Sequence, residues 1–151
     1  MSDDLVFGDA APDVEYTTRV SAYVVIEDDR ARVAVVRAPR GIFLPGGGVD
    51  PGELARDAVV REAEEETGLI VEVTEELGSA TELVRAQPGH RFNLAKASSF
   101  FRAVVVGEGT AVEDDHTLLW MTKDEAAGEL RYGSHAWAVR GGARGWYAAE
   151  R

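Results

Sequence analysis

The sequence contains no cysteine. Disulfides, thiolate metal sites and cysteine nucleophiles are therefore excluded. Long apolar runs are also missing, since the longest, such as 23–26 and 103–106, fall far short of the ~20 residues that a membrane-spanning helix needs. Five acids precede Arg19, the first base, so no signal peptide with a positive start is expected. The predicted location is the cytoplasm, with no membrane association.

Positive charge is scarce in this chain. Sixteen Lys and Arg stand against 27 Asp and Glu, which leaves a formal net charge of −11, and no basic block stands out. Such a chain repels polynucleotide phosphates, so no polynucleotide binding is expected. A small phosphorylated substrate remains compatible with the sequence, provided that something cancels the negative charge locally.

The remaining composition is that of a globular domain. Hydrophobic residues make up 45% and charged residues 28% of a chain of 151 residues, which is the size of one ordinary domain. No repeat, low-complexity tract or linker divides the chain, so residues 1–151 are predicted to form a single domain. The acidic residues 1–18 are expected to be a loose terminus or an edge strand.

The pattern along the chain predicts a mixed α/β fold. Strands are expected over 19–26, 32–37, 69–77, 99–106 and 117–121, with a less regular strand, loop and strand over 78–97. Turn residues predict a hairpin turn at 27–30 and a loop, rich in Gly and Pro, over 40–52. Helices are expected over 53–67, which Gly68 would end, from Thr122 with its capping-box partner Glu125 to about 130, and over 134–150 with a weak point at Gly141-Gly142.

The helix predicted over 53–67 has an apolar stripe in its first half. At about 100° per residue, and with Ala55 set at zero, Ala58 lies near ~300° and Val59 near ~40°. Asp57 and Glu64 point to the opposite side, at roughly 180–200°. The stripe is therefore expected to face the core.

Three glutamates continue this stripe toward the C-terminal end of the same helix. Glu62, Glu65 and Glu66 fall near ~340°, ~280° and ~20°, at spacings that make their side chains neighbours. Like charges so close together repel, and turning them toward the protein body costs solvation. A hard cation held by carboxylate oxygens would relieve both effects, and the helix dipole favours a cation at this end. The alternative is a solvated acidic helix end with no function.

A longer pattern surrounds these glutamates. Gly47 is followed after five residues by Glu53, and after seven more by Arg61-Glu62-Ala63-Glu64-Glu65-Glu66-Thr67-Gly68-Leu69. This spacing resembles the Nudix box, in which Gly, Glu, Arg-Glu, Glu-Glu and Gly occupy defined positions. Every defined position is matched, and the preceding Leu44-Pro45-Gly46 is also usual in the family. One minor position departs, because Asp50 stands where the family often has Glu.

The resemblance implies a fold and a reaction. The fold would be an α/β/α sandwich with a mixed β-sheet and a loop–helix–loop catalytic motif. The reaction would be Mg²⁺-dependent hydrolysis of the diphosphate bond in a nucleoside diphosphate linked to another group, such as a nucleoside triphosphate, nucleotide sugar or dinucleotide; Mn²⁺ also suits such a site. By position, the family's metal ligands correspond to Glu62, Glu65, Glu66 and the backbone carbonyl of Gly46. The family's supporting pair, which orients Glu62, corresponds to Glu53 and Arg61.

Further side chains are candidates for the general base or for substrate contact. Glu62 and Glu65 are the first candidates for the base. The second candidates are the acids just before the strand expected at 117–121, namely Glu113, Asp114 and Asp115, although a solvated turn also accounts for them. Substrate contact is expected from residues in or beside the glycine-rich loop, namely Arg37, Arg40 and Gly47.

Histidine and tryptophan are given no chemical role. The histidines match no metal spacing, so packing in the core or on the surface is expected for His90, His116 and His135. Trp120 is expected in the core, and Trp137 and Trp146 are expected to anchor the last helix.

Two other function classes share the fold implied by the resemblance. A nucleotide-sensing or binding module with weak catalysis is one alternative, although the complete set of carboxylates argues against it. Isopentenyl diphosphate isomerisation usually relies on a cysteine, which this chain lacks. Residues outside the box do not select a substrate, so an oxidised nucleoside triphosphate is as compatible as any other, and a homodimer stays open.

Overall fold

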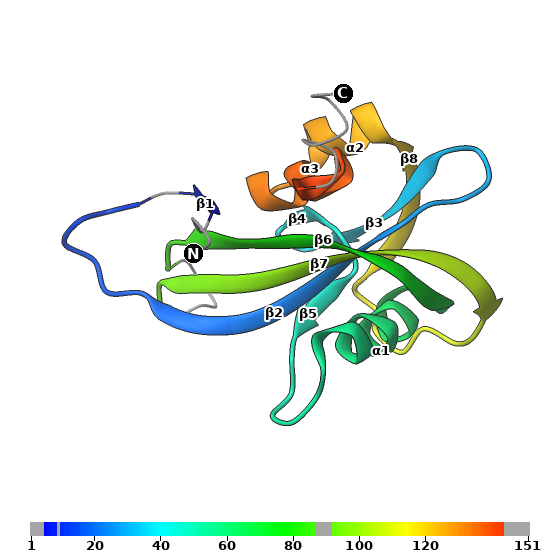
Figure 1. The fold of residues 1–151 in the computed structure, drawn as a ribbon, viewed down its shortest axis with the longest axis horizontal. Coiled ribbons are helices and arrows are strands. Elements are labelled where there is room, and N and C mark those ends of the chain that lie inside the picture. Colours follow the sequence, from blue (N-terminus) through cyan, green and yellow to red (C-terminus); the bar gives the residue numbers. More distant parts are fainter. Residues whose placement is uncertain (1–4, 9, 87–91, 144–151) are drawn as a thin grey trace.

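The computed structural model describes residues 5–8, 10–86 and 92–143. Two β-sheets lie between one helix on one side and two helices on the other (Figure 1). The strands are β1 (Leu5–Gly8), β2 (Thr17–Ile26), β3 (Arg32–Ala38), β4 (Gly41–Phe43), β5 (Gly46–Gly48), β6 (Leu69–Val84), β7 (Leu94–Glu108) and β8 (Thr117–Thr122). The helices are α1 (Ala55–Thr67), α2 (Lys123–Glu129) and α3 (Gly133–Val139). The predicted α/β/α architecture is confirmed.

The larger sheet mixes parallel and antiparallel pairs in the order β1-β6-β7-β2-β5. β1 runs parallel to β6, and β7 runs parallel to β2, whereas β6–β7 and β2–β5 are antiparallel. Residues 1–18 are expected to be a loose terminus or an edge strand, and β1 within them is an edge strand of this sheet. The two strands expected within 78–97 are the end of β6 and the start of β7, which continue the strands expected at 69–77 and 99–106 through their long antiparallel pairing.

The hairpin expected at 27–30 joins two different sheets. One isolated bridge links Glu27 and Val33, after which β2 pairs with β7 and β5 while β3 pairs with β4 and β8. Residues 22–26 and 33–36 are buried at every position, so each strand needs apolar neighbours on both faces. This double burial accounts for the divergence of the two strands.

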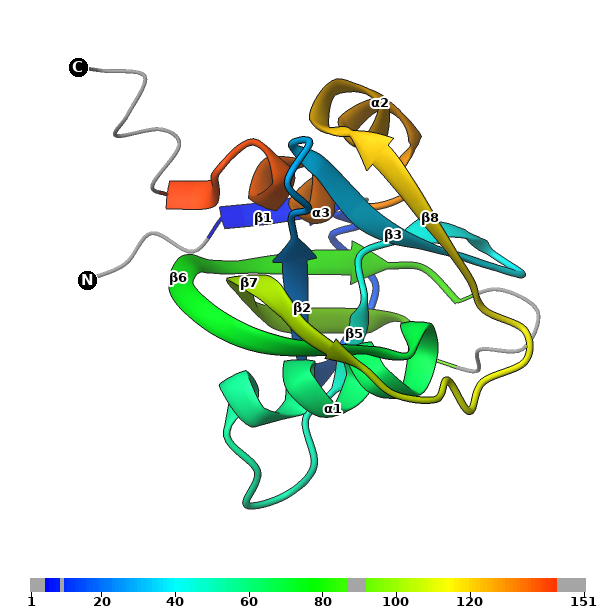
Figure 2. The ribbon, with the colours of Figure 1, turned by 90° about the vertical axis from the view of Figure 1, so that its right-hand side faces the viewer.

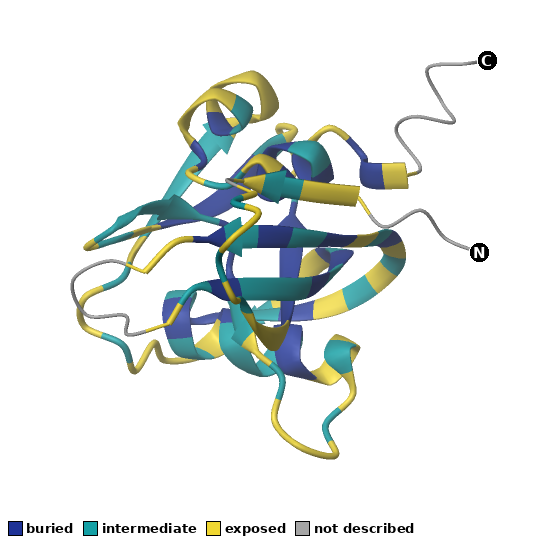
Figure 3. Cartoon of the chain, turned by 90° about the vertical axis from the view of Figure 1, so that its left-hand side faces the viewer, coloured by how far each residue is buried: buried dark blue, intermediate teal, exposed yellow. Residues whose placement is uncertain are grey.

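Alternate residues of β2 and β3 belong to two separate cores. Tyr23 and Val25 pack in the core beneath α2 and α3, whereas Ala22 and Val24 pack in the core that α1 covers. Figure 2 shows α1 below the strands and α2 and α3 above them. Figure 3 shows that buried residues concentrate in the strands between these layers. The helices therefore close the sandwich on two opposite sides.

The stretch 40–52 is not a loop throughout, as its composition suggests. It contains β4 and β5, and β5 pairs with β2 through Tyr23 and Gly46. A three-residue strand is too short to show a hydrophobic period in sequence. The pairing matters for function because it fixes Gly46–Gly48 next to α1.

The last predicted helix, over 134–150, is interrupted at its expected weak point, Gly141-Gly142. α3 ends at Val139, and Gly141 and Gly142 follow with φ of +107° and +56°. A Cβ on Gly142 would lie 2.3 Å from the carbonyl oxygen of Leu77, so only glycine fits this approach. Residues 144–150, and with them Trp146, lie outside the described residues.

The remaining local predictions concern α2 and the aromatic side chains. The capping box of α2 is confirmed, because Thr122 Oγ1 accepts from the N–H of Glu125 at 3.1 Å and the Glu125 carboxylate accepts from the N–H of Thr122 at 3.0 Å. Trp120 and Trp137 pack against the two cores. No helix of the described residues has the length and apolar character needed to cross a membrane.

Candidate active site

Helix α1 turns one face inward along its whole length. Ala58 and Val59 are fully buried, whereas Asp57 and Glu64 are exposed, as the helical wheel predicts. The helix ends at Gly68, whose φ of +78° is favoured by glycine and whose N–H donates to the carbonyl of Glu64 at 2.9 Å. The inward face therefore continues into the last turn, where the glutamates stand.

Glu66 is the most buried of these glutamates, with 8% of its surface exposed. Its Oε1 accepts from the backbone N–H of Gly46 at 2.8 Å, and its Oε2 lies 3.3 Å from Nε2 of His116. Burial, together with the nearby carboxylates of Glu62 and Glu113, raises the pKa of Glu66 to about 8 against the lowering effect of the Gly46 hydrogen bond. The surroundings therefore disfavour the charged form of this carboxylate, which a bound cation would stabilise.

The glycines of β5 allow the backbone to approach these carboxylates closely. A Cβ on Gly47 would lie 3.2 Å from the carboxyl carbon of Glu62. Gly46 has φ of +148°, and a Cβ there would lie 2.2 Å from the carbonyl oxygen of Ala22. The pKa of Glu62 is raised, first because the side chain is partly buried, and the contact with Arg61 opposes that shift.

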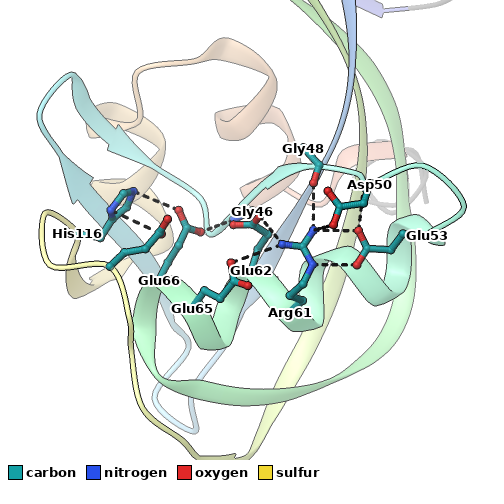
Figure 4. A network of polar contacts seen from close by, with 10 residues as sticks. Gly46, Gly48, Asp50, Glu53, Arg61, Glu62, Glu65, Glu66 and His116 are labelled. Atoms are coloured by element: carbon teal, nitrogen blue, oxygen red, sulfur yellow. Dashed lines mark hydrogen bonds and ion pairs between the residues drawn. The ribbon is translucent and has the colours of Figure 1, made fainter.

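Arg61 is the hub of the polar network (Figure 4). Its Nε and Nη2 donate to the two carboxylate oxygens of Glu53, both at 2.9 Å, which is a bidentate pair. Its Nη1 donates to Glu62 at 2.9 Å and lies 3.5 Å from Glu65. Nη2 also donates to the carbonyl of Gly48 at 3.3 Å. Arg61 thus joins the start of α1, its end and the glycine strand.

The bidentate pair sets the charge of both partners. The hydrogen bonds from Arg61 hold the pKa of Glu53 at about 2, and the N–H of Asp50 donates to the same carboxylate at 3.0 Å. The pKa of Arg61 is raised in return, chiefly by Glu53. Both side chains are therefore charged at neutral pH.

The loop before β8 is attached to the C-terminal end of α1. The N–H groups of Val112 and Glu113 both donate to the carbonyl of Glu65, at 2.9 and 3.2 Å, so the loop satisfies a carbonyl that the helix itself leaves free. His116 follows, with Nδ1 2.8 Å from Asp115 Oδ1 and 3.7 Å from Glu113 Oε2. The loop therefore brings an imidazole and a further carboxylate next to Glu66.

The expected site residues are brought together in part. Glu66, Glu113 and His116 each offer a ligand atom within 4.8 Å of the others, whereas Glu62 and Glu65 turn toward Arg61. Sequence reasoning gives His116 no role. The sequence feature that could have indicated a site role for His116 is its position, directly after three acids and directly before a strand.

The second histidine within the described part of the chain, His135, is a core residue as expected. It is 1% exposed, lies among aromatic rings, and accepts through Nδ1 from the N–H of Leu44 at 3.1 Å. Burial lowers its pKa to about 3, so the ring is neutral. His135 thereby holds the segment that leads into Gly46. His90 lies outside the described residues.

A pocket of about 330 Å³ opens beside Glu66. Arg40, Gly46 and His116 line it together with aromatic side chains from β2, β4 and the start of α3. Of the other residues expected to contact substrate, Arg37 is exposed and does not line this pocket, and Gly47 lies against Glu62 instead. Glu66 and Asp115 are the acids that line this pocket, so Glu66 connects it with the carboxylates at the end of α1.

The donor chemistry of this site fits a divalent cation. Its side chains offer several carboxylate oxygens, which are the ligands that hard cations prefer. Oε2 of Glu113 is buried and has no hydrogen-bond partner among the described residues. A cation placed among these groups would supply positive charge that balances the carboxylates of Glu113 and the buried Glu66.

Comparison with known proteins gives consistent results. The family model described as the NUDIX domain matches residues 17–140. An ADP-ribose pyrophosphatase of Methanocaldococcus jannaschii is 38% identical over 94 residues, which cover 60% of this chain and 53% of that protein. The chain thus spans about half the length of that curated relative.

Two further comparisons cover more of the chain. A MutT-like protein of Streptomyces ambofaciens is 32% identical over 120 residues, which cover 79% of this chain and 71% of that protein. The solved NUDIX hydrolase of Nitrosomonas europaea superposes with a TM-score of 0.70 at 21% identity, covering 89% of this chain and 92% of the other. With the family model matched over most of its length, this chain belongs to the NUDIX domain family.

Proposed function

We propose that this protein is a pyrophosphohydrolase that uses Mg²⁺ to hydrolyse the diphosphate bond of a nucleoside diphosphate linked to another group. The observation that carries the proposal is the buried carboxylate of Glu66, which lies with ligand atoms of Glu113 and His116 within 4.8 Å of one another. An acid so placed needs a cation, and a diphosphate needs one as well. A relative named ADP-ribose pyrophosphatase supports the reaction class.

The metal ligands in this proposal are Glu62, Glu65, Glu66 and the carbonyl of Gly46, with Glu113 as an additional acid. When bound, the cation neutralises the diphosphate oxygens and lowers the pKa of a coordinated water; Mn²⁺ would serve equally. Such charge cancellation would let a chain of net charge −11 bind an anionic substrate. Because a chain of this net charge repels the many phosphates of a polynucleotide, we propose a small substrate and no polynucleotide.

The chain's own groups have separate roles in this proposal. Arg61 and Glu53 are positioning residues, because their bidentate pair fixes the start of α1 and aims Arg61 at Glu62. Glu62 or Glu65 accepts the proton of the attacking water, and Glu113 is the alternative. Asp115 lines the pocket and lies 2.8 Å from Nδ1 of His116, whereas Asp114 is exposed.

A substrate screen tests the proposal. Nucleoside triphosphates, nucleotide sugars and dinucleotides are incubated with the protein, with and without Mg²⁺ or Mn²⁺, and products are identified by mass spectrometry. We expect a nucleoside monophosphate, or its phosphate-bearing equivalent, only when the metal is present. Nucleotide-dependent stabilisation without turnover of any compound would instead favour the nucleotide-sensing module.

The matched variants are Glu65→Gln and Glu64→Gln on the same helix. Glu65→Gln is expected to lower kcat at least ~10³-fold, because it removes a charge and a metal ligand. Glu64 is exposed on the opposite face, so Glu64→Gln should retain full activity. Full activity of Glu65→Gln would remove Glu65 from the ligand set.

A further inference from the structure

The pocket beside Glu66 has a second polar end, formed by Lys96. This lysine lies on β7 opposite Arg19 of β2, four residues before Phe100, which pairs with Tyr23. Because residues four apart on a strand share a face, Lys96 and Tyr23 line the same pocket from one sheet. Lys96 is therefore about 13 Å along the strand from Phe100, the partner of Tyr23.

The ammonium of Lys96 is poorly compensated. Among the residues that the structure describes, no carboxylate forms an ion pair with it, and its Nζ lies over the ring of Tyr132, 5.2 Å from the centroid. The nearest acid in register, Glu82, accepts instead from the N–H and hydroxyl of Ser134, at 3.0 and 2.7 Å. Burial lowers the pKa of Lys96, as do Arg19 and Arg40, and the charge of Glu82 opposes that shift only in part. An oxygen acceptor in the pocket would restore the lost solvation.

The walls between the two ends suit a flat ring. Phe43 and Tyr132 contact each other with ring centroids 5.1 Å apart and ring planes tilted by 59°, so a flat ligand can stack on one of them and meet the edge of the other; both line the pocket with Tyr23. Aromatic side chains can stack on any nucleobase, because every base has a flat π-face. The pocket volume of about 330 Å³ falls within the range of small-molecule sites.

The charge of the pocket favours a neutral acceptor over a second anion. Two basic side chains, Arg40 and Lys96, line it, and two acidic ones, Glu66 and Asp115, line it as well. Lysine has three donors and no acceptor, so it pairs with a carbonyl oxygen and opposes an amino group at the same place. The amino group of adenine or cytosine would place its N–H donors against the N–H donors of Lys96, and no hydrogen bond would form.

We propose that Lys96 selects nucleotides whose base presents a keto oxygen where adenine and cytosine carry an amino group, as guanine does at O6 and uracil at O4, with the base packed against the aromatic wall of Phe43 and Tyr132. This inference rests on the proposed function, because it assigns the pocket to the nucleoside part of the same substrate. Lys96 is a specificity-determining residue and takes no part in the bond cleavage.

Matched substrates test the assignment. Hydrolysis of GDP-glucose is compared with ADP-glucose, UDP-glucose with CDP-glucose, and GTP and UTP with ATP and CTP, each in Mg²⁺. The wild-type protein is expected to prefer the keto member of at least one pair by about tenfold or more in kcat/KM, which is the scale of one charge-assisted hydrogen bond. Lys96→Met should abolish that preference by raising KM for the keto substrate alone. Lys123→Met, at an exposed lysine on α2, is the control and should change nothing.

Binding is measured separately so that the two proposals can fail separately. Calorimetry with GMP, UMP, AMP, CMP and inorganic pyrophosphate compares the wild type with Lys96→Met and with Lys96→Gln, which keeps a polar group if the methionine variant folds poorly. Keto-selective binding that depends on Lys96, without hydrolysis of any compound, would reject the proposed function and keep this assignment. No keto preference, a preference that survives loss of the lysine, or Lys96-dependent binding of pyrophosphate alone would overturn it.

Discussion

At the scale of single residues, the site depends on the guanidinium of Arg61. It contacts Glu53 through two parallel hydrogen bonds and reaches Glu62 through a third. An ammonium group cannot make this fork, because its three donors are not planar and its reach is different. Arginine is therefore required for geometry as well as for charge.

Arg61→Lys is predicted to lower activity about 10–100-fold, which is the usual effect of losing a group that orients metal ligands. The charge remains, so the loss would come from a freed Glu62 and Glu53. Steady-state kinetics at several Mg²⁺ concentrations measure the effect. Arg56→Lys, at an exposed position in the first turn of α1, is the control. Unchanged kcat/KM in Arg61→Lys would show that the fork is dispensable.

Residue identity and spacing were enough to predict that the glutamates of α1 share one face of the helix, but not which groups each of them contacts. A helical wheel places Glu62, Glu65 and Glu66 on one face, and a helix is a local structure. His116 reaches Glu66 only because a loop fifty residues later is attached to the end of α1. Lys96 likewise reaches the pocket through strand pairing. Such long-range contacts leave no periodic signal in the sequence.

At the scale of elements, β5 and α1 form one unit. The backbone of Gly46 pairs with Tyr23 on one side and donates to Glu66 on the other. The three glycines of β5 are not equivalent, because a Cβ on Gly46 meets backbone whereas a Cβ on Gly48 meets nothing within 4 Å.

Gly46→Ala is predicted to destabilise the fold by at least about 2 kcal/mol, because it combines a positive φ with a clash against the backbone of Ala22. Gly48→Ala should leave the free energy of unfolding within about 0.5 kcal/mol of the wild type. Urea denaturation of both variants measures the difference. Equal stability of the two would contradict the close approach at Gly46.

Elements with a local signal were predictable, and those defined by their partners were not. α1, its Gly68 end and the capping box of α2 follow from nearby residues. The three-residue strands β4 and β5 exist only through pairing. The separation of β2 from β3 also required knowledge of what covers each face.

At the scale of the whole molecule, the burial of His135 makes stability depend on pH. Its folded pKa of about 3 lies below the ~6.5 of an unfolded histidine, so the unfolded chain binds the extra proton between these values. The contribution is therefore complete above pH ~6.5 and is lost as the pH falls toward 3. Glu66, whose pKa is raised, acts in the opposite sense between about 4.5 and 8.

His135→Gln is predicted to reduce the loss of stability on acidification from pH 6.5 to 4.5 by roughly 2 kcal/mol, because glutamine can accept from Leu44 without titrating. Denaturation curves at both pH values give the difference, and the comparison between variants cancels the effect of Glu66. Val139→Ala, which loosens the same core without removing a titratable group, should keep the wild-type dependence. Identical pH dependence in all three proteins would show that His135 is not the responsible group.

The alternation of β2 between two cores has a consequence for tolerance of insertions. One residue added near the middle of β2 would shift the following side chains by one position and so exchange the faces of Val24 and Val25. Both cores, the one under α1 and the one under α2 and α3, would then lose packing contacts. A single-residue deletion would do the same. In related proteins, insertions and deletions should therefore occur at the ends of β2 and in the turns, whereas the middle of the strand should differ only by substitutions.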